Sequence, residues 1–296
     1  MGAFQCLPGR CRRKSFVNST EKTLEQALER SAPKVLEIHE AIRIEGEHEL
    51  SRPPMALALS GLAAGLSMGF SLLTEALLTH HLPQAEWVPL VAKFGYCVGF
   101  LIVILGRQQL FTENTLTPIL ALFSEPEPPM FMRLFRLWAV VLVANLVGAA
   151  LFAACIACTN LLEHPVHEVM LKIGQTALEP EAMTIFLRAI FAGWLIALMV
   201  WLLPFAETAR IWVIILVTYV VGLGHFAHII AGSVDVFYLV FSSAAGLGQV
   251  VNHYMLPTLL GNTLGGVSLV AILHHAQLRA DHGEEGPPQN EPPQSS

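Results

Sequence analysis

Long apolar runs separated by short polar stretches make up most of the chain. Residues 55–74, 137–162 and 211–234 carry no formal charge, and a further apolar run, residues 189–205, follows Arg188. A transmembrane helix needs about 20 mostly apolar residues. Each of these runs therefore predicts a segment that crosses a membrane.

Two regions predict helices that are broken at membrane depth. Residues 88–123 are apolar, but polar side chains interrupt them at 107–109 and 112–114. Residues 222–233 contain three glycines and two histidines within an apolar run. Backbone that leaves a helix inside a membrane is tolerated only within protein or against a cavity. The two interruptions are therefore candidate walls of a pore.

The ends of the chain are polar and predict separate segments. Residues 20–48 place apolar side chains at helical spacing, which predicts an amphipathic helix interrupted at Pro33. We expect three domains: a cytoplasmic N-terminal segment over 1–53, a six-span channel domain over 54–278, and a disordered cytoplasmic tail over 279–296.

The composition supports a membrane protein and narrows its function. Only 14% of the residues are charged and 54% are hydrophobic, whereas a soluble domain carries about 25% charged residues. No basic face or reading motif for nucleic acid is present, so we expect no nucleic-acid partner. We also expect no cofactor and no metal, and the lipid bilayer as the surroundings.

The positive charges predict the orientation. Cytoplasmic loops are enriched in Lys and Arg. With six spans, Arg133, Arg136, Arg210 and Arg279 fall on the same side as the basic N-terminal segment. Both termini are then cytoplasmic.

The chain repeats one pattern twice. Each half opens with a helix of small residues (63–69 and 192–194), continues with an interrupted helix, and closes with a helix that contains Asn145 or Asn262. Three spans in each half place the halves in opposite orientations. We therefore predict an all-α membrane protein of six transmembrane helices in two inverted repeats, with helices 2 and 5 broken, and a transport site at the breaks.

Three motifs stand in order along the chain: Leu-Phe-Thr at 110–112, Phe-Ala-His-Ile-Ile-Ala at 226–231, and Gly-Asn-x-x-Gly-Gly at 261–266. Together they resemble the formate/nitrite transporter family. The acidic N-terminal helix and Glu113-Asn114 most resemble its YfdC-like inner-membrane branch. The resemblance implies an aquaporin-like fold, a homopentamer with one pore per subunit, and a multi-pass protein of a bacterial inner membrane. It also implies a channel or transporter, not an enzyme, for formate, nitrite or a similar small monovalent anion or its protonated weak acid.

The resemblance assigns roles to residues of this sequence. His228 would be the central histidine of the pore and Thr112 its hydrogen-bonding partner, with Phe226 in the same loop as His228. The pore would be narrowed by Leu110 and Phe111 on one side and by Phe100 on another, and Asn262 would lie near the lumen.

Three positions depart from the family pattern. Ala227 and Gln109 stand where the family carries acidic residues, and Gly193 stands where it usually carries an asparagine near the pore. These departures leave the substrate and any proton coupling open.

A central histidine suits the transport of a weak acid. A bare anion at the bilayer centre costs several kcal/mol, and proton transfer to the anion removes much of that cost. Histidine titrates near neutral pH and could give such a proton. In the alternative interpretation, His228 is a packed neutral histidine bonded to a backbone carbonyl.

Two arginines are further candidates. Arg188, at the outer end of the fourth span, is a possible vestibule cation that attracts anions, or it extends toward lipid headgroups. Arg107 and Glu113 flank the first interruption, where we expect a structural ion pair.

Two other functions remain open from the residues. One is a pore for small neutral solutes, of the aquaglyceroporin type, which the uncharged Ala227 and Gln109 permit. The other is a membrane metalloenzyme that uses His225, His228 and His253, although their spacing lacks the His-Glu-x-x-His pattern of helix-borne zinc sites.

Overall fold

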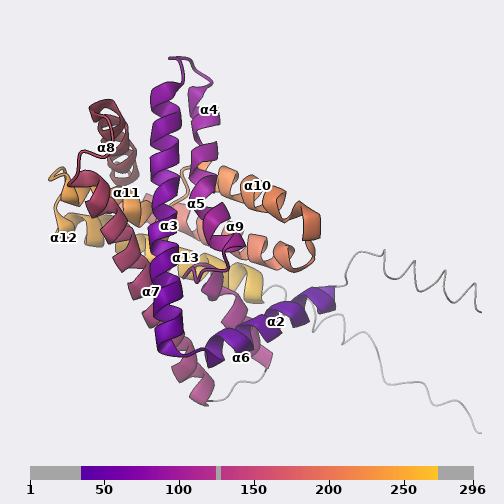
Figure 1. The fold of residues 1–296 in the computed structure, drawn as a ribbon. Helices are drawn as coiled ribbons and strands as arrows, with labels where there is room; N and C mark the ends of the chain where they lie inside the picture. Colours follow the sequence, from indigo (N-terminus) through magenta and orange to yellow (C-terminus); the bar gives the residue numbers. More distant parts are fainter. Residues whose placement is uncertain (1–34, 125–127, 273–296) are drawn as a thin grey trace, which may run out of the picture. The chain divides into compact units, whose positions relative to one another are not determined.

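The computed structural model describes residues 35–124 and 128–272 (Figure 1). The chain divides into two compact units, residues 1–37 and 38–296, and the architecture below is that of the second unit. Every regular element in the described ranges is helical. This confirms the prediction of an all-α protein for that part of the chain.

Four segments among the described residues are long and apolar enough to cross a membrane. They are Pro54–His81 (α3), Val88–Leu105 (α4, Val88–Ala92, with α5, Phe94–Leu105), Pro128–Ala157 (α7) and Ala182–Phe205 (α9, Ala182–Leu202, with a short 3-10 turn). Three of these segments, α3, α7 and α9, contain most of the residues at 55–74, 137–162 and 189–205, where the sequence predicted membrane crossings.

Two of these helices extend beyond the predicted runs because their charged side chains have partners. α3 continues past residue 74 to His81, and its Glu75 pairs with Lys93 at 2.5 Å. α7 begins at Pro128 instead of residue 137, and Arg136 in its early turns donates to the backbone oxygen of Leu50 at 2.9 Å.

The run at 211–234 is divided between two helices. α10 (Arg210–Leu223) ends at the second interruption, and α11 (Ile229–Phe241) begins beyond it. The final helical stretch combines α12 (Leu247–Gln249), α13 (Leu256–Leu264) and two π-helical segments, and it extends from Leu247 to Ile272. The elements that remain are α6 (Thr117–Ser124) and α8 (His164–Leu178).

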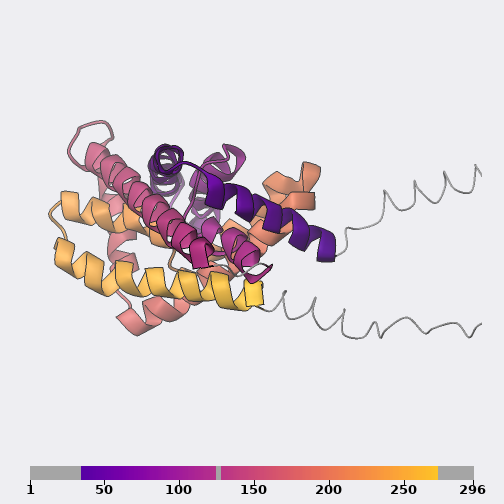
Figure 2. The same cartoon turned by 90° about the horizontal axis from the view of Figure 1, so that it is seen from below.

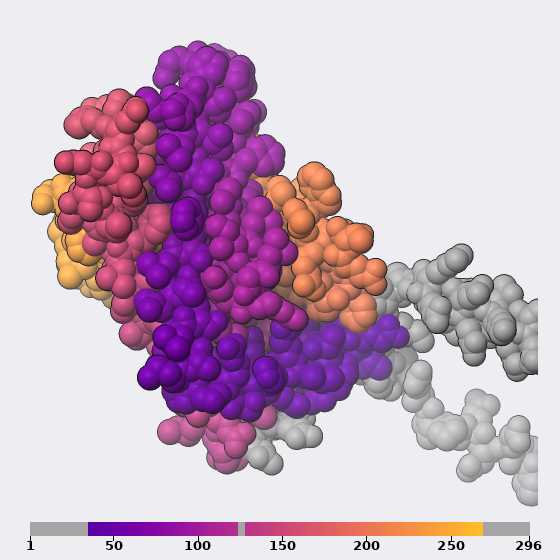
Figure 3. Space-filling view, in the orientation of Figure 1, coloured from indigo at the N-terminus to yellow at the C-terminus, as the bar shows by residue number. Residues whose placement is uncertain are grey.

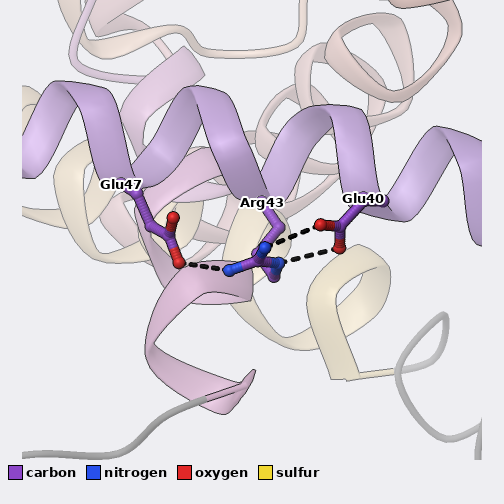
Figure 4. A network of polar contacts seen from close by, with 3 residues as sticks. All are labelled: Glu40, Arg43 and Glu47. Atoms are coloured by element: carbon purple, nitrogen blue, oxygen red, sulfur yellow. Dashed lines mark hydrogen bonds and ion pairs between the residues drawn. The ribbon is translucent and has the colours of Figure 1, made fainter.

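The N-terminal helix is described from Val35 onward. α2 (Val35–Ser51) matches the C-terminal part of the amphipathic helix expected at 20–48, and the predicted interruption at Pro33 and the predicted tail at 279–296 lie outside the described residues. On its exposed side Arg43 pairs with Glu40 at 2.6 Å and also with Glu47 (Figure 4). Exposed pairs of this kind stabilise a helix by only about 0.3–0.5 kcal/mol each.

Close contacts between helices are made at glycines. α3 packs against α5, and Figure 3 shows these two helices side by side on one face. On α2, a Cβ at Gly46 would overlap the backbone of Thr117, so α2 meets the start of α6, as the view in Figure 2 shows from below. α3 meets α7 in the same way, because a Cβ at Gly65 would overlap the backbone oxygen of Asn145. The corresponding contact in the second half joins Gly193 of α9 to the backbone of Asn262.

Candidate functional site

The two interruptions share one backbone geometry. α5 and α10 each end in a glycine followed by a residue in the left-handed region, Arg107 with φ 53° and His225 with φ 50°. The next residue in each case donates its N–H five residues back, Gln108 to Val103 at 3.0 Å and Phe226 to Val221 at 3.0 Å. This pattern is a Schellman motif, which usually carries glycine at the left-handed position.

Buried Asn145 holds the first interruption in place. Its Nδ2 donates to the backbone oxygens of Gly61 at 2.7 Å and Gln109 at 2.9 Å, and its Oδ1 accepts from the N–H of Phe111 at 2.9 Å. The side-chain amide therefore satisfies two backbone groups of the broken segment, at Gln109 and Phe111, and ties them to Gly61 of the unbroken helix α3.

Buried Asn262 does the same for the second interruption. Its Nδ2 donates to the oxygens of Ala189 at 2.8 Å and Ala227 at 2.9 Å, and its Oδ1 accepts from the N–H of Ile229 at 2.8 Å. Asn262, expected near a lumen, is fully buried and is not among the residues that line either cavity described below.

His228 caps the helix that follows the second interruption. Its Nδ1 accepts from the N–H groups of Ile230 at 3.3 Å and Ala231 at 3.2 Å. Nδ1 is thus an acceptor, and the proton of the neutral ring is on Nε2. Nε2 lies 2.8 Å from Thr112 Oγ1, so the ring donates this hydrogen bond across to the first interruption. The expected proximity of His228 and Thr112 is therefore present, with both side chains buried.

Aromatic and aliphatic side chains surround this pair. The ring of Phe100 meets the His228 ring edge-on, with centroids 5.0 Å apart. Leu110 and Phe111 are buried, and Leu110 occupies the same position in the first interruption that His228 occupies in the second. Phe226 stacks on Phe191 with centroids 5.5 Å apart.

One cavity is lined by residues of the second interruption and another by residues of the first. A large cavity of about 260 Å³ includes Phe226, Ala227 and His228 in its lining, and a small cavity of about 100 Å³ includes Gln108 and Gln109. We give the name barrier layer to one set of buried side chains at the interruptions. It consists of His228, which lines the large cavity, and of four side chains that line neither cavity: Phe100, Leu110, Phe111 and Thr112.

Charged side chains line the large cavity. Arg188, the expected vestibule cation, is among them, as are Lys172 and the ion pair of Glu75 with Lys93. Asp235 of α11 also lines it. Neither of these carboxylates, Glu75 or Asp235, was predicted as a site residue from the sequence. Each of them interrupts an otherwise apolar stretch, and intramembrane ionisable residues are functional candidates by default.

The small cavity is lined partly by α2. Glu49 accepts hydrogen bonds from Thr117 Oγ1 at 2.6 Å and from Gln109 Nε2 at 3.2 Å. Burial raises the pKa of Glu49 to about 7, and these hydrogen bonds limit the rise. The prediction of an ion pair between Arg107 and Glu113 is wrong, because Arg107 pairs with a different carboxylate. Arg107 pairs with Glu45 at 3.0 Å, because α2 brings this carboxylate to the exposed end of the interruption.

The three histidines of the metalloenzyme alternative have separate surroundings. His228 bonds Thr112, His253 lies 2.9 Å from the backbone oxygen of Pro180, and His225 is exposed at the large cavity. Within the described ranges no three His, Cys, Asp or Glu side chains are grouped to hold a metal ion.

Comparisons with known proteins give a consistent result. The family profile described as formate/nitrite transporter matches residues 36–276. The inner membrane protein YfdC of Escherichia coli (strain K12) is 41% identical over 260 residues, which cover 88% of this chain and 84% of YfdC. The formate channel BtFdhC of Bacillus thuringiensis is 22% identical over 255 residues, 83% of this chain and 96% of that protein.

Solved structures share the fold. One described as an FNT family ion channel matches with a TM-score of 0.71 and 19% identity, covering 81% of this chain and 98% of that one. A pentameric formate channel with formate bound matches with a TM-score of 0.66 and 19% identity, covering 76% and 98%.

Proposed function

This chain belongs to the formate/nitrite transporter family, and from that membership we propose that it passes a small monovalent anion, or its protonated weak acid, through the barrier layer. The substrate class is that of formate and nitrite. The relative BtFdhC is a formate channel, and one structural neighbour is a pentameric formate channel with formate bound.

The hydrogen bond between His228 and Thr112 carries this proposal. It joins the two interruptions inside a layer that is otherwise apolar, with Phe100 and Leu110 beside it. An anion or acid that enters the layer loses its water and needs a polar partner there. The Nε2–H of His228 can turn from Thr112 to a substrate oxygen, and the Thr112 hydroxyl can donate to the same substrate.

The large cavity supports an anionic substrate. Arg188 and Lys172 line it, while Lys93 is already paired with Glu75. Unpaired cations in a cavity raise the local concentration of anions. Arg188 would serve as a vestibule cation, and Phe226 would border the path between the cavity and His228.

The matched interruptions support six crossings arranged as two inverted, aquaporin-like repeats. Two Schellman motifs, two buried asparagines and two helix contacts at Gly65 and Gly193 recur in the same order in each half. Inverted repeats with discontinuous helices place substrate sites at the repeat interface.

We further propose that the chain lies in a bacterial inner membrane with both termini in the cytoplasm. A reporter fused after Arg279 that was active only outside the cytoplasm would contradict this orientation.

Flux measurements in proteoliposomes test the function. We expect entry of formate and nitrite that depends on the protein, and much slower entry of glycerol. Rapid glycerol entry without formate or nitrite entry would instead support the neutral-solute pore. Entry of none of the three would contradict both.

A further inference from the structure

One stripe of α11 faces the large cavity. His228, Gly232 and Asp235 all line it, and they are spaced four and three residues apart. Residues at this spacing share one side of a helix, and the stripe from His228 to Asp235 extends roughly 10 Å along the axis at about 1.5 Å per residue. A carboxyl group thus stands above the barrier layer on the same face as the histidine.

His228 is poorly placed to be the source of a proton. A cationic ring would need a proton on Nδ1, which accepts the N–H groups of Ile230 and Ala231 at the start of α11. Protonation would remove this cap and place a positive charge at a helix N-terminus, where the helix dipole disfavours it. A substrate that becomes neutral in this site therefore needs a different proton donor.

Asp235 has the surroundings of such a donor. Glu75 is paired with Lys93 at 2.5 Å, and Asp235 interacts electrostatically with both of them. Among these three groups, one ammonium faces two carboxylates, so they carry one net negative charge unless a carboxyl binds a proton. Within residues 35–124 and 128–272, the Asp235 side chain makes no hydrogen bond or ion pair, and it faces the cavity.

The Tyr254 hydroxyl group lies against Gly232, the residue between His228 and Asp235 in this stripe. A Cβ at Gly232, the middle residue of the stripe, would overlap the Tyr254 hydroxyl oxygen. Tyr254 also lines the large cavity. A phenol can accept one hydrogen bond while it donates another, so this hydroxyl can link a group near Asp235 to one near His228.

We propose that Asp235 is the proton-exchanging residue of the large cavity and that the Tyr254 hydroxyl passes its proton to an anion held at His228. This proposal rests on the weak-acid transport proposed above. The Asp235 O–H bond breaks as its proton moves to Tyr254, and the Tyr254 proton moves to an oxygen of the anion. Asp235 is left as a carboxylate near Lys93, the acid crosses the barrier layer neutral, and Asp235 takes a new proton from water in the cavity.

Several other charged or titratable groups face this cavity and contribute to its pH dependence. His225 stands at its edge, and the remaining groups come from α3, the α4–α5 junction, α8, α9 and the final helical stretch: Glu75, Lys93, Tyr96, Lys172, Arg188 and Tyr254. The Asp235→Asn variant leaves all of them in place, so a changed pH profile in that variant reports on Asp235.

The test follows internal acidification of proteoliposomes loaded with a pH-sensitive dye after external formate is added, between pH 5 and 8. For wild type we expect acidification, since a neutral acid that enters releases its proton inside. Asp235→Asn should acidify at least about tenfold more slowly, with a flattened pH profile, and Tyr254→Phe should also be slow. Asp235→Glu should recover much of the rate because it keeps the carboxyl group. Glu179→Gln, a surface carboxylate outside the cavity lining, should match wild type.

The outcomes separate this proposal from the function on which it rests. Wild-type acidification rates and pH profiles in Asp235→Asn and Tyr254→Phe would overturn the relay while transport of formate stands. Formate entry into wild-type vesicles without acidification would overturn it as well. If wild type admits neither formate nor nitrite, the transport function itself is wrong. Should Asp235→Asn fail to fold, Tyr254→Phe and Asp235→Glu still decide the matter.

Discussion

At the scale of single residues, the hydrogen bonds of His228 define what the ring can do. Nδ1 is occupied by the start of α11, and Nε2 points to Thr112. The ring is therefore arranged to donate a hydrogen bond while remaining neutral. The hypothesis that histidine supplies the proton and the proposal that Asp235 supplies it now differ in a measurable way.

The substitution His228→Asn separates these two ideas. Asparagine is a good helix cap, so α11 should stay in place, but its shorter side chain does not reach Thr112. The loss of this polar partner should raise the free energy of formate in the barrier layer by about 1.5–3 kcal/mol, so formate flux should fall roughly 10- to 100-fold. A small neutral solute should be little affected.

The pH profile of the remaining flux identifies the proton donor. If His228 supplies the proton, the dependence between pH 5 and 8 disappears in His228→Asn, whereas with the Asp235 relay it persists. A variant that transports formate at the wild-type rate at every pH would make the histidine structural and favour the neutral-solute pore.

Asn262 gives a second prediction at this scale. In Asn262→Leu, the oxygen of Ala227 and the N–H of Ile229 at the interruption lose their side-chain partner, and each buried unsatisfied group costs about 1–3 kcal/mol. We expect a loss of folded protein or a marked fall in melting temperature in detergent. Asn145→Leu should behave alike, and Asn252→Leu, at an exposed position, should not. Equal stability of all three variants would contradict the positioning role.

The sequence motifs predicted the residues at the barrier layer better than those of the cavity. His228 and Thr112 lie in two interruptions that apolar runs make visible, and the resemblance pairs them. Glu75 and Asp235 lie outside the matched motifs, and Asp235 comes directly after the charge-free run at 211–234. Lys93, which pairs with Glu75, and Tyr254, which lines the same cavity as Asp235, belong to other helical segments, so no local pattern brings these groups together.

At the scale of secondary-structure elements, the helix α2 contacts the first interruption through its buried Glu49. Its Glu49 bonds both Gln109, next to Leu110, and Thr117, at the start of α6. The amphipathic pattern predicted a helix over 20–48, which ends one residue before Glu49. Glu49 is buried, because Gly46 lets α2 approach the backbone of Thr117 closely.

Glu49 should make stability depend on pH. Its pKa rises from 4.5 to about 7 on folding, so the folded protein binds the proton more tightly than the unfolded chain. Folded-state stability from this group is therefore greatest below pH 4.5 and is lost as pH rises toward 7, by about 3 kcal/mol at most. Glu49→Gln resembles the protonated form, so its melting temperature should exceed that of wild type more at pH 8 than at pH 5.

A matched variant on the same helix controls this measurement. Glu47 has a side chain that is 41% exposed and pairs with Arg43, so Glu47→Gln should show no such difference between the two pH values. A wild-type melting temperature that changes with pH in parallel with that of Glu49→Gln would show that Glu49 does not titrate in this range.

At the scale of the whole molecule, the apolar faces of the long helices raise the question of assembly. Many large apolar side chains on α3, α7 and α9 are exposed in the single chain, where lipid or another subunit would cover them. A structural neighbour is described as pentameric. We expect a homopentamer, and native mass spectrometry in mild detergent should give a mass five times that of the chain. A spectrum of monomers alone would count against it.

The apolar runs of the sequence predicted where helices form more securely than how the helices are arranged. Uninterrupted runs such as 55–74 specify a span by length and composition alone. The region at 211–234 has the same composition but contains a Schellman motif with His225 at the left-handed position, which sequence rarely reveals because glycine is usual there. The glycines and histidines at 222–233, and not hydropathy, indicated that this run divides.

The barrier layer between the two cavities also has a consequence for electrical behaviour. In the proposed pore, water in each cavity would conduct, so the transmembrane voltage would fall mainly across the layer that contains Phe100, Leu110 and His228. An elementary charge that crosses the full potential gains or loses about 2.3 kcal/mol per 100 mV, whereas a neutral acid gains or loses nothing. A voltage clamped across the vesicle membrane should therefore leave acid flux unchanged, and any steep voltage dependence would mean that the bare anion itself crosses the layer.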